Sequence, residues 1–294
     1  MKKRTRILKA IINPVRFGTL HTYYWLRRKT RRMRVGDERP FYSIIVASYN
    51  YAHLIGETLD SLLEQTYDRY EVIVVDDGST DNSMAVIQGY CERNGRIRLY
   101  THEGHQNRGL CETVKLALAQ ARGEYIAFCE SDDKWDARHL EKLTQFVNRY
   151  RDVVFVHNRI RFIGNSRYQH KMISHTEKMQ KQYFHTGYNH INIHHHATYN
   201  PIATFSSVTI RADVLRPLDF NSPVPSHLDL WLYRQIFARH PMHYCDNAIT
   251  YWRMHTDSYC SEDLTERGAK LNVALEELIA ASDKLIDRQV TNNG

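Results

Sequence analysis

Two apolar runs that end in acids decide the fold. The first reads Tyr70-Glu-Val-Ile-Val-Val-Asp-Asp77, and the second reads Tyr125-Ile-Ala-Phe-Cys-Glu-Ser-Asp-Asp133. A short run rich in β-branched residues is typical of a parallel strand that is buried on both faces. Because α/β folds bind ligands where their parallel strands end, we expect these acids at the ligand-binding edge of a sheet. The pattern favours a site for a metal and a phosphorylated ligand.

Strand and helix patterns alternate from about residue 40 to residue 160. Strands are predicted at 41–48, 70–76, 96–100, 125–129 and 153–163, and helices at 54–65, 80–93, 110–122 and 136–150. This βα rhythm predicts an α/β fold with a doubly wound, mostly parallel sheet and right-handed crossovers. A nucleotide is expected across the ends of the first, second and fourth strands.

Charge is distributed unevenly along the chain. The 294 residues are 42% hydrophobic and 25% charged, which predicts a folded globular protein with one large core or one core and a smaller lobe. The net charge is +7, but residues 1–39 hold 13 Lys and Arg against 2 Asp and Glu, whereas residues 40–294 hold 27 against 31. The excess positive charge therefore belongs to an N-terminal arm.

The arm mixes basic residues with apolar and aromatic ones, in part at helical spacing. Such a segment is expected to lie on an anionic membrane surface, and the alternatives are a solvated tail or contact with RNA or DNA. No uncharged run approaches the ~20 residues that span a bilayer, and no signal peptide is recognisable. Five cysteines without a C-x-x-C pair fit a reducing compartment. We expect a cytoplasmic protein, peripheral on the inner face of the membrane, with no nucleic-acid partner.

The second acidic cluster needs a compensating charge. Carboxylates close together raise one another's pKa, and desolvation adds to the cost of ionising them. A divalent cation such as Mn²⁺ or Mg²⁺ resolves this conflict, because it prefers carboxylate oxygens and completes its shell with phosphate and water. The alternative for Glu130-Ser131-Asp132 is a solvated loop with a helix cap at Asp133 or Asp136.

Further motifs accompany these runs in a fixed order. They are Ser43-Ile-Ile-Val-Ala-Ser-Tyr-Asn50, Leu59-x-Ser-Leu-Leu-x-Gln-Thr66, Tyr70 to Asp81, Asn107-Arg108-Gly109, Ala121-Arg-Gly-Glu-Tyr-Ile126 and Glu130-Ser-Asp-Asp-x-Trp135. Together they resemble the nucleotide-binding half of family 2 glycosyltransferases. The resemblance is close from residue 43 to about 145 and continues more thinly through Ser206-Ser-Val208, Asp229-Leu-Trp-Leu232 and Tyr251-Trp-Arg-Met-His255.

The resemblance implies a GT-A fold and an inverting transfer from a nucleotide sugar, in the first place a UDP-sugar. The acceptor would be a hydroxyl of a glycan or of a lipid-linked glycan in surface polysaccharide synthesis. It also implies a catalytic domain at 40–260, divided into a nucleotide-sugar half at 40–150 and an acceptor half at 151–260. The arm at 1–39 precedes this domain, and a C-terminal helical segment at 261–294 follows it.

Roles carried over by position fall into two groups. The residues expected around the nucleotide sugar are Ala47, Tyr49, Glu57, Asp76, Asp77, Asn107, Gly109, Glu130, Ser131, Asp133 and Arg253. The metal would be held by Asp132, with Glu130 and His255 beside it. The family usually has Asp where this chain has Glu130, so the role of Glu130 as a metal ligand or a ribose contact stays open.

An inverting transfer also needs a base outside the metal cluster. Asp229 is the first candidate, and His227, which stands where the family has an acid, is the second. A helix cap or a purely structural acid is the alternative for this segment. The histidines 185, 190, 194, 195 and 196 fit an acceptor-side loop, a plain polar loop or a metal site.

Rival functions remain possible at this level. A sugar nucleotidyltransferase should show a Gly-rich phosphate loop after its first strand, and a dinucleotide oxidoreductase should show G-x-G-x-x-G there; the chain has neither. A non-catalytic protein that binds nucleic acid or membrane would act through its basic arm.

Overall fold

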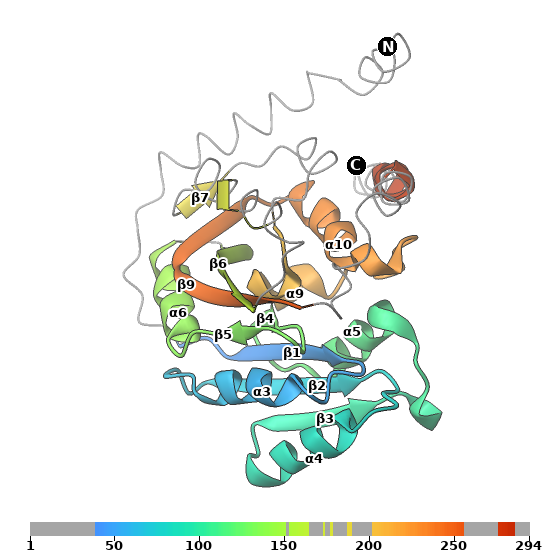
Figure 1. Cartoon of the computed structure of the whole chain (residues 1–294). Coiled ribbons are helices and arrows are strands. Elements are labelled where there is room, and N and C mark those ends of the chain that lie inside the picture. The colour runs from blue at the N-terminus through green and yellow to red at the C-terminus, as the bar shows by residue number, and fades with distance from the viewer. Residues whose placement is uncertain are drawn as a thin grey trace, which may run out of the picture.

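The computed structural model describes residues 39–150, 153–164, 173, 177–178, 187–189, 202–255 and 276–285. Within these residues the strands form one sheet of nine, in the order β3-β2-β1-β4-β8-β6-β9-β5, with β7 paired to β9. Figure 1 shows β3, β2 and β1 stacked from the bottom of the molecule upward, with the helices packed around the sheet.

The strands are β1 (Tyr42–Ser48), β2 (Tyr70–Asp76), β3 (Ile97–Thr101), β4 (Tyr125–Phe128), β5 (Lys134–Trp135), β6 (Phe155–Gly164), β7 (Gly187–Asn189), β8 (Val208–Arg211) and β9 (Met242–Met254). The α-helices are α3 (Ile55–Leu63), α4 (Ser83–Arg93), α5 (Gly109–Gln120), α6 (His139–Arg149), α9 (Ala212–Leu215) and α10 (Leu228–Phe237). Short 3₁₀ helices are η1 (Glu103–His105), η3 (Phe205–Ser207) and η4 (Pro225–His227).

The first half of the sheet, β3-β2-β1-β4, is parallel throughout. Strand β2 is buried along its whole length, because alternate side chains point into two helical layers. Val72 and Val74 pack in the core cluster that contains α3, α4 and α6, whereas Ile73 and Val75 pack in the cluster that contains α5. The predicted doubly wound α/β fold is confirmed.

The second half of the sheet is mixed. Strand β8 is antiparallel to both β4 and β6, and β6 is parallel to β9. Strand β9 is antiparallel to β5 and β7. The predicted strand at 153–163 is β6, and it lies beyond the parallel run.

The order of the strands reverses beside β1. The chain places β2 and β3 on one side of β1 and β4 on the other, so a crevice opens at the carboxyl ends of β1 and β4. Asp76 ends β2 and Asp77 follows it, and Glu130 to Asp133 follow β4. Both acidic clusters therefore lie at the edge of the sheet where this fold binds its ligands.

The amino end of β2 is fixed by an ion-pair network around Glu71, which is 3% exposed. Arg122 donates to Glu71 from Nε at 3.0 Å and from Nη2 at 2.7 Å, and Arg98 pairs with the same carboxylate. Ser43 Oγ donates to Glu71 at 2.7 Å, and a Cβ added at Gly123 would lie 2.4 Å from Ser43 N. The Arg122-Gly123 motif thus anchors the connection from α5 to β4.

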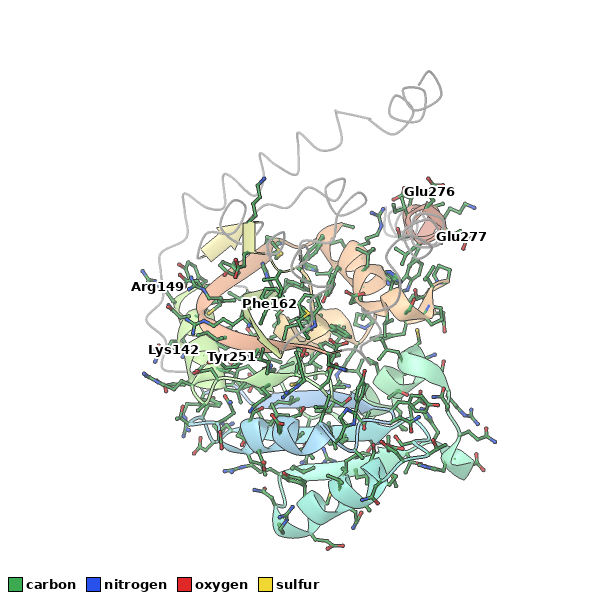
Figure 2. All side chains as sticks on the ribbon, viewed as in Figure 1. Lys142, Arg149, Phe162, Tyr251, Glu276 and Glu277 are labelled. Carbon is green, nitrogen blue, oxygen red and sulfur yellow. The ribbon has the colours of Figure 1, made fainter. Side chains whose placement is uncertain are left out.

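Residues 276–285 form a helix that packs on α10. Leu278 is fully buried in the shared core, whereas Glu276 and Glu277 point outward (Figure 2). Arg234 of α10 is 1% exposed; its Nη2 donates to Asp283 at 2.7 Å and its Nε to Ser282. The predicted C-terminal helical segment is therefore attached, through these residues, to the helix that carries Asp229.

Several predictions concern residues outside this description. They include those for residues 1–38 of the arm and for the histidines between 185 and 196. The predicted domain boundaries likewise stay predictions. In the part of the chain that the structure describes, no helix is long and apolar enough to cross a membrane.

Candidate functional site

The turn after β2 is held by Asp76, which is fully buried. Its Oδ1 accepts the Ser79 backbone N–H at 2.8 Å, and its Oδ2 accepts the Ser79 hydroxyl at 2.6 Å. Gly78 in this turn has φ +77°, and an added Cβ would lie 2.6 Å from the backbone nitrogen of Asn107. The carboxylate of Asp76 therefore fixes the turn at the rim of the crevice. Gly78 in this turn has no side chain, so the loop that contains Asn107 can approach closely.

Asp77 fixes the start of α5. Its Oδ1 accepts the Arg108 backbone N–H at 2.7 Å, and its Oδ2 accepts the Gly109 N–H at 2.9 Å. The ring of His102 lies 3.4 Å from Oδ1. The carboxylate thus satisfies N–H groups at a helix N-terminus, where negative charge is stabilised. The structure brings the predicted Asn107-to-Gly109 turn against Asp77.

An aromatic side chain stands open at the end of β1. Among the described residues, Tyr49 is the large hydrophobic residue whose side chain remains exposed, at 45%. Ala47, two residues earlier, is half-buried. Asn50 adopts φ 57°, accepts the Thr80 N–H at 2.8 Å and donates its own N–H to Ser79 Oγ at 2.9 Å. These bonds fix the loop that carries Tyr49, so its ring can offer a face to a planar base.

The acidic cluster after β4 consists of Glu130, Asp132 and Asp133. Asp133 is fully buried, and its Oδ1 accepts the Arg253 backbone N–H at 2.8 Å. Ser131 lies between them with its carbonyl oxygen turned to α3, where it accepts the Thr58 hydroxyl at 2.9 Å. The side chains of Glu130 and Asp133 meet at the Thr204 hydroxyl, at 2.8 and 3.1 Å.

Like charges dominate this acidic cluster. Burial raises the pKa of Asp133 well above its usual range, and the charges of Asp132 and Glu130 raise it further. Glu130 is open to solvent on one side, yet desolvation by the surrounding protein raises its pKa, and the charges of Asp132 and Asp229 add to the rise. Among the described residues, no Arg or Lys side chain bonds to Glu130 or Asp133.

The end of β9 closes the site from the other side. His255 Nε2 lies 3.0 Å from Asp132 Oδ2, and the ring of His255 meets Tyr51 edge-on at 5.6 Å. Arg253 Nε donates to the Asp132 carbonyl at 2.8 Å, and its Nη2 donates to Glu57 at 2.7 Å. Glu57, expected near the nucleotide, is thus an ion-pair partner of Arg253, and the pairing lowers its pKa.

The donor atoms suit a hard divalent cation held by two side chains. Among the described residues no three His, Cys, Asp or Glu side chains converge on one point. The predicted set of Asp132, Glu130 and His255 is therefore not assembled, because the Glu130 carboxylate is turned to Thr204. Asp132 and His255 are in contact, and His255 Nδ1 is buried with no hydrogen-bond partner among the residues that the structure describes. Since Mg²⁺ or Mn²⁺ takes one or two protein ligands and completes its shell with diphosphate and water, this pair fits.

Helix α10 faces the acidic cluster. Asp229 in its first turn lies close enough for its charge to raise the pKa of both Glu130 and Tyr233. His227 lies just before the helix, where its Nδ1 is 2.9 Å from the Ser226 hydroxyl. The structure therefore places Asp229 within electrostatic range of the cluster, and its role as a base stays a prediction.

Three polar side chains near the cluster were given no role in the sequence analysis. Thr204 precedes η3 and Ser206, quoted there only within a motif, lies inside it; Ser206 Oγ accepts the Glu130 backbone N–H at 2.8 Å. Tyr233 is fully buried on α10, near Asp229 and Glu130, with no hydrogen-bond partner for its hydroxyl among the described residues. The signals available were Thr204-x-Ser206-Ser207 before a strand, and Tyr233 one helical turn after Asp229.

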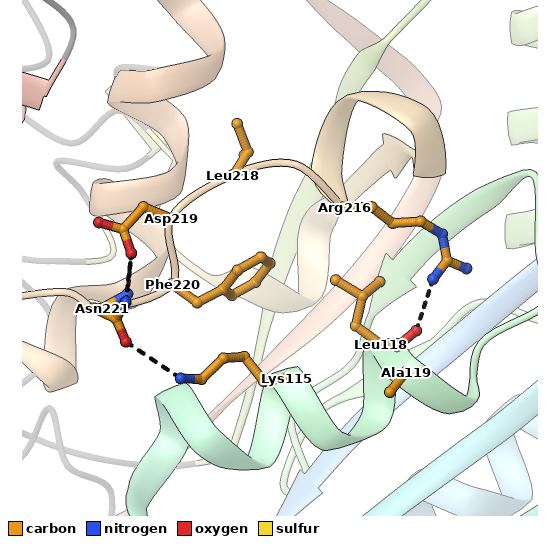
Figure 3. A pocket seen from close by; sticks show the side chains of 8 residues that line it. All are labelled: Lys115, Leu118, Ala119, Arg216, Leu218, Asp219, Phe220 and Asn221. Carbon is orange, nitrogen blue, oxygen red and sulfur yellow. Dashed lines mark hydrogen bonds between the residues drawn. The ribbon is translucent and has the colours of Figure 1, made fainter. Parts of the chain in front are cut away.

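A separate cavity of about 390 Å³ lies between α5 and the loop after α9 (Figure 3). Its two cations are already engaged: Arg216 donates to the carbonyls of Leu118 and Ala121 at 3.0 and 2.6 Å, and Lys115 donates to Asn221 at 3.3 Å. None of the predicted site residues lines this cavity, and its chemistry is that of a structural groove.

Comparison with known proteins agrees with this geometry. The family model described as glycosyl transferase family 2 matches residues 43–211. The UDP-Glc:alpha-D-GlcNAc-diphosphoundecaprenol beta-1,3-glucosyltransferase WfgD of Escherichia coli is 35% identical over 124 residues, 42% of this chain and 47% of that protein. The chain thus matches less than half the length of that relative.

Two solved structures are similar in fold. Staphylococcus aureus TarS 1–349 in complex with UDP-GlcNAc has a TM-score of 0.61 at 19% identity and covers 82% of this chain and 66% of that one. The mannosyltransferase PcManGT from Pyrobaculum calidifontis, in complex with GDP-Man and Mn²⁺, has a TM-score of 0.52 at 20% identity and covers 83% and 67%. Both matches confirm the predicted GT-A fold.

Proposed function

Because the chain belongs to glycosyl transferase family 2, we propose that it moves a sugar from a UDP-sugar to a hydroxyl of a glycan or lipid-linked acceptor in surface polysaccharide synthesis. One observation carries this proposal: the acidic cluster after β4, in which burial and like charges raise the pKa of Glu130 and Asp133, lies at the same edge of the sheet as the exposed Tyr49 and within electrostatic range of Asp229. The family assignment replaces the nucleotidyltransferase and the non-catalytic binding protein as alternatives.

The donor would lie across the ends of β1, β2 and β4. Tyr49 would stack on the base, and Asp77 with the Asn107-to-Gly109 turn would form the wall that meets its edge. The hydrogen bonds of Asp77 to two backbone N–H groups support this role, because they fix the carboxylate before a ligand arrives. UDP is the first choice because TarS is described with UDP-GlcNAc and WfgD with UDP-Glc.

Asp132 and His255 would hold Mn²⁺ or Mg²⁺ with the donor diphosphate. When bound, the ion would neutralise charge on the departing diphosphate. Arg253 would face the same phosphates, because its guanidinium is already held beside Asp132. The PcManGT complex contains Mn²⁺, which supports the choice of ion.

Asp229 would act as the base, with His227 as the second candidate. It would take the proton of the acceptor hydroxyl while that oxygen forms a bond to the anomeric carbon and the bond from this carbon to the diphosphate oxygen breaks. One such displacement inverts the anomeric configuration. The position of Asp229 beside Glu130 supports this role, because the sugar would lie between them.

The basic arm would place the enzyme on an anionic membrane surface. Its 13 Lys and Arg against 2 acids in residues 1–39 support this part of the proposal. WfgD is described as acting on a diphosphoundecaprenol acceptor, and a lipid-linked acceptor would be reached most directly from such a surface.

The test is a screen of nucleotide sugars for Mn²⁺-dependent hydrolysis and transfer by the full chain. We expect turnover with a UDP-sugar, a loss of about 10³-fold in Asp132→Ala, and a loss of about 10²- to 10⁴-fold in transfer by Asp229→Asn. Wild-type hydrolysis by Asp132→Ala would reject the metal assignment. Normal transfer by Asp229→Asn would move the base to His227 or elsewhere.

A further inference from the structure

Thr204 reaches the acidic cluster from a distant part of the chain. It precedes η3, lies 74 residues after Glu130 in sequence and is 4% exposed. The ring of Phe205 stacks on Phe128 of β4 at 3.8 Å, and β8 then pairs with β4. This packing holds the side chain of Thr204 at the carboxyl end of β4.

The hydroxyl of Thr204 is held in position by hydrogen bonds within its own turn. Its oxygen accepts the Ser206 backbone N–H at 3.1 Å, as an N-cap residue does. The Thr204 carbonyl accepts the Ser207 hydroxyl at 2.9 Å. Because both contacts are local, the hydroxyl oxygen has a set position before any ligand arrives, and its proton is free to point to the cluster.

Two carboxylates share this hydroxyl. Glu130 Oε2 lies 2.8 Å and Asp133 Oδ2 lies 3.1 Å from Thr204 Oγ1. Asp133 has other donors, including the Arg253 N–H at 2.8 Å. For the Glu130 carboxylate, Thr204 is the side-chain donor found among the described residues. Without it, repulsion from Asp132 and Asp133 would turn Glu130 out to solvent.

We propose that Thr204 is a positioning residue that holds Glu130 and Asp133 beside Asp132, so that their negative charge favours a divalent cation bound at Asp132 and His255 with the donor diphosphate. The inference rests on the proposed function, because it concerns the same site. Thr204 contacts neither the ion nor the sugar; it acts through the two carboxylates.

The test compares three variants of the full chain. Thr204→Val keeps the branched shape and removes the hydroxyl, and Thr204→Ser keeps the hydroxyl. Ser207→Ala is the matched control, because Ser207 is 1% exposed in the same turn and its hydroxyl bonds, among the described residues, to the Thr204 carbonyl and not to the carboxylates. Melting temperature reports folding, electron paramagnetic resonance of free Mn²⁺ reports ion binding in the presence of UDP, and donor hydrolysis gives kcat and KM.

We expect Thr204→Val to weaken Mn²⁺ binding with UDP by about 10- to 100-fold and to lower kcat by a similar factor. Thr204→Ser should recover most of both losses. Ser207→Ala should lower the melting temperature as much as Thr204→Val does, without weakening Mn²⁺ binding.

Three results would overturn the inference. If Thr204→Val binds Mn²⁺ with UDP as tightly as the wild type, the positioning role is wrong and the proposed function stands. If Ser207→Ala weakens binding equally, the effect is a general loosening of the turn. If the wild type binds UDP and Mn²⁺ adds nothing, the metal part of the proposed function fails, and the role of Thr204 fails with it.

Discussion

The carboxylates after β2 and those after β4 lie at the same edge of the sheet, yet their surroundings differ. Asp76 and Asp77 each receive two hydrogen bonds from nearby N–H or O–H groups, one on each oxygen. Asp133 also accepts one donor on each oxygen, the Arg253 N–H and the Thr204 hydroxyl, but it shares that hydroxyl with Glu130, and burial and the charges of Asp132 and Glu130 raise its pKa. Acids at strand ends can therefore stabilise a loop or favour binding of a cation. Which of the two they do depends on the hydrogen-bond donors around them.

The largest expected effect is on the free energy of unfolding: neutralising a carboxylate should lower it at the end of β2 and raise it at the end of β4. Asp77→Asn replaces an acceptor by an amide N–H₂ that faces a backbone N–H, so we expect the free energy of unfolding to fall by about 1–3 kcal/mol. Asp133→Asn keeps an acceptor for Arg253 and removes a buried like charge, so we expect that free energy to rise by about 1–2 kcal/mol. Urea unfolding at pH 7 with a chelator present measures both.

Asp68→Asn is a suitable control for these two variants, because Asp68 precedes β2 at its amino end and its one ion pair among the described residues, with Arg39, is exposed and contributes little. Stabilisation by Asp77→Asn, or destabilisation by Asp133→Asn, would remove the distinction between the two ends of the crevice.

Glu71 extends this comparison, because it is a buried carboxylate that has the cations Arg98 and Arg122 beside it. Burial opposes its ionisation, but hydrogen bonds from Ser43 and Arg122 and the charge of Arg98 outweigh burial and lower its pKa below the ordinary 4.5. Its ionisation therefore stabilises the fold above about pH 4.5, and this stabilisation is lost as pH falls through the folded-state pKa.

We expect Glu71→Gln to be less stable than the wild type at pH 7 and to approach it at about pH 3. Chemical unfolding at several pH values measures the difference, with the surface variant Glu92→Gln as the control. A constant gap between Glu71→Gln and the wild type across this range would mean that packing, and not charge, accounts for the role of Glu71.

The smallest effect should come from Glu57. Its ion pair with Arg253 is half exposed, at 52% for the Glu57 side chain, so Glu57→Gln should change stability by less than about 1 kcal/mol. Arg253 would lose one of its anchors, and we expect the KM for the donor to rise about threefold with a smaller change in kcat. Steady-state kinetics measure this, with Glu64→Gln at the end of the same helix as the control. A large fall in kcat would instead favour direct contact of Glu57 with the donor.

Sequence periodicity predicted β1, β2, β3, β4 and β6 and the edge where the acids meet, because these depend on local backbone geometry. The helix predicted from 136 begins three residues later at His139, since Asp136 first closes a turn by accepting the Arg138 N–H at 3.0 Å. Strands β5, β7, β8 and β9 were not predicted: the two residues of β5 carry no periodic signal, and β7, β8 and β9 lie beyond residue 163, where the predicted alternation of strands and helices ends.

The partners of the site residues were less predictable. The donors to Asp77 are backbone N–H groups, and the direction in which such a group points cannot be predicted from the type of residue. Arg253 meets Glu57 across 196 residues, and Thr204 meets Glu130 across 74. Such pairs depend on how the mixed half of the sheet folds back on the parallel half. The sequence motifs predicted which residues belong to the site. They did not predict which of these residues form hydrogen bonds or ion pairs with one another.

The buried Arg234 has a consequence for the synthesis of the chain. Its guanidinium is out of water and depends on Ser282 and on Asp283, which follows it by 49 residues. Helix α10 therefore leaves the ribosome well before the segment that neutralises its buried charge. The packing of the helix that carries Asp229 is therefore complete only when Ser282 and Asp283 are present.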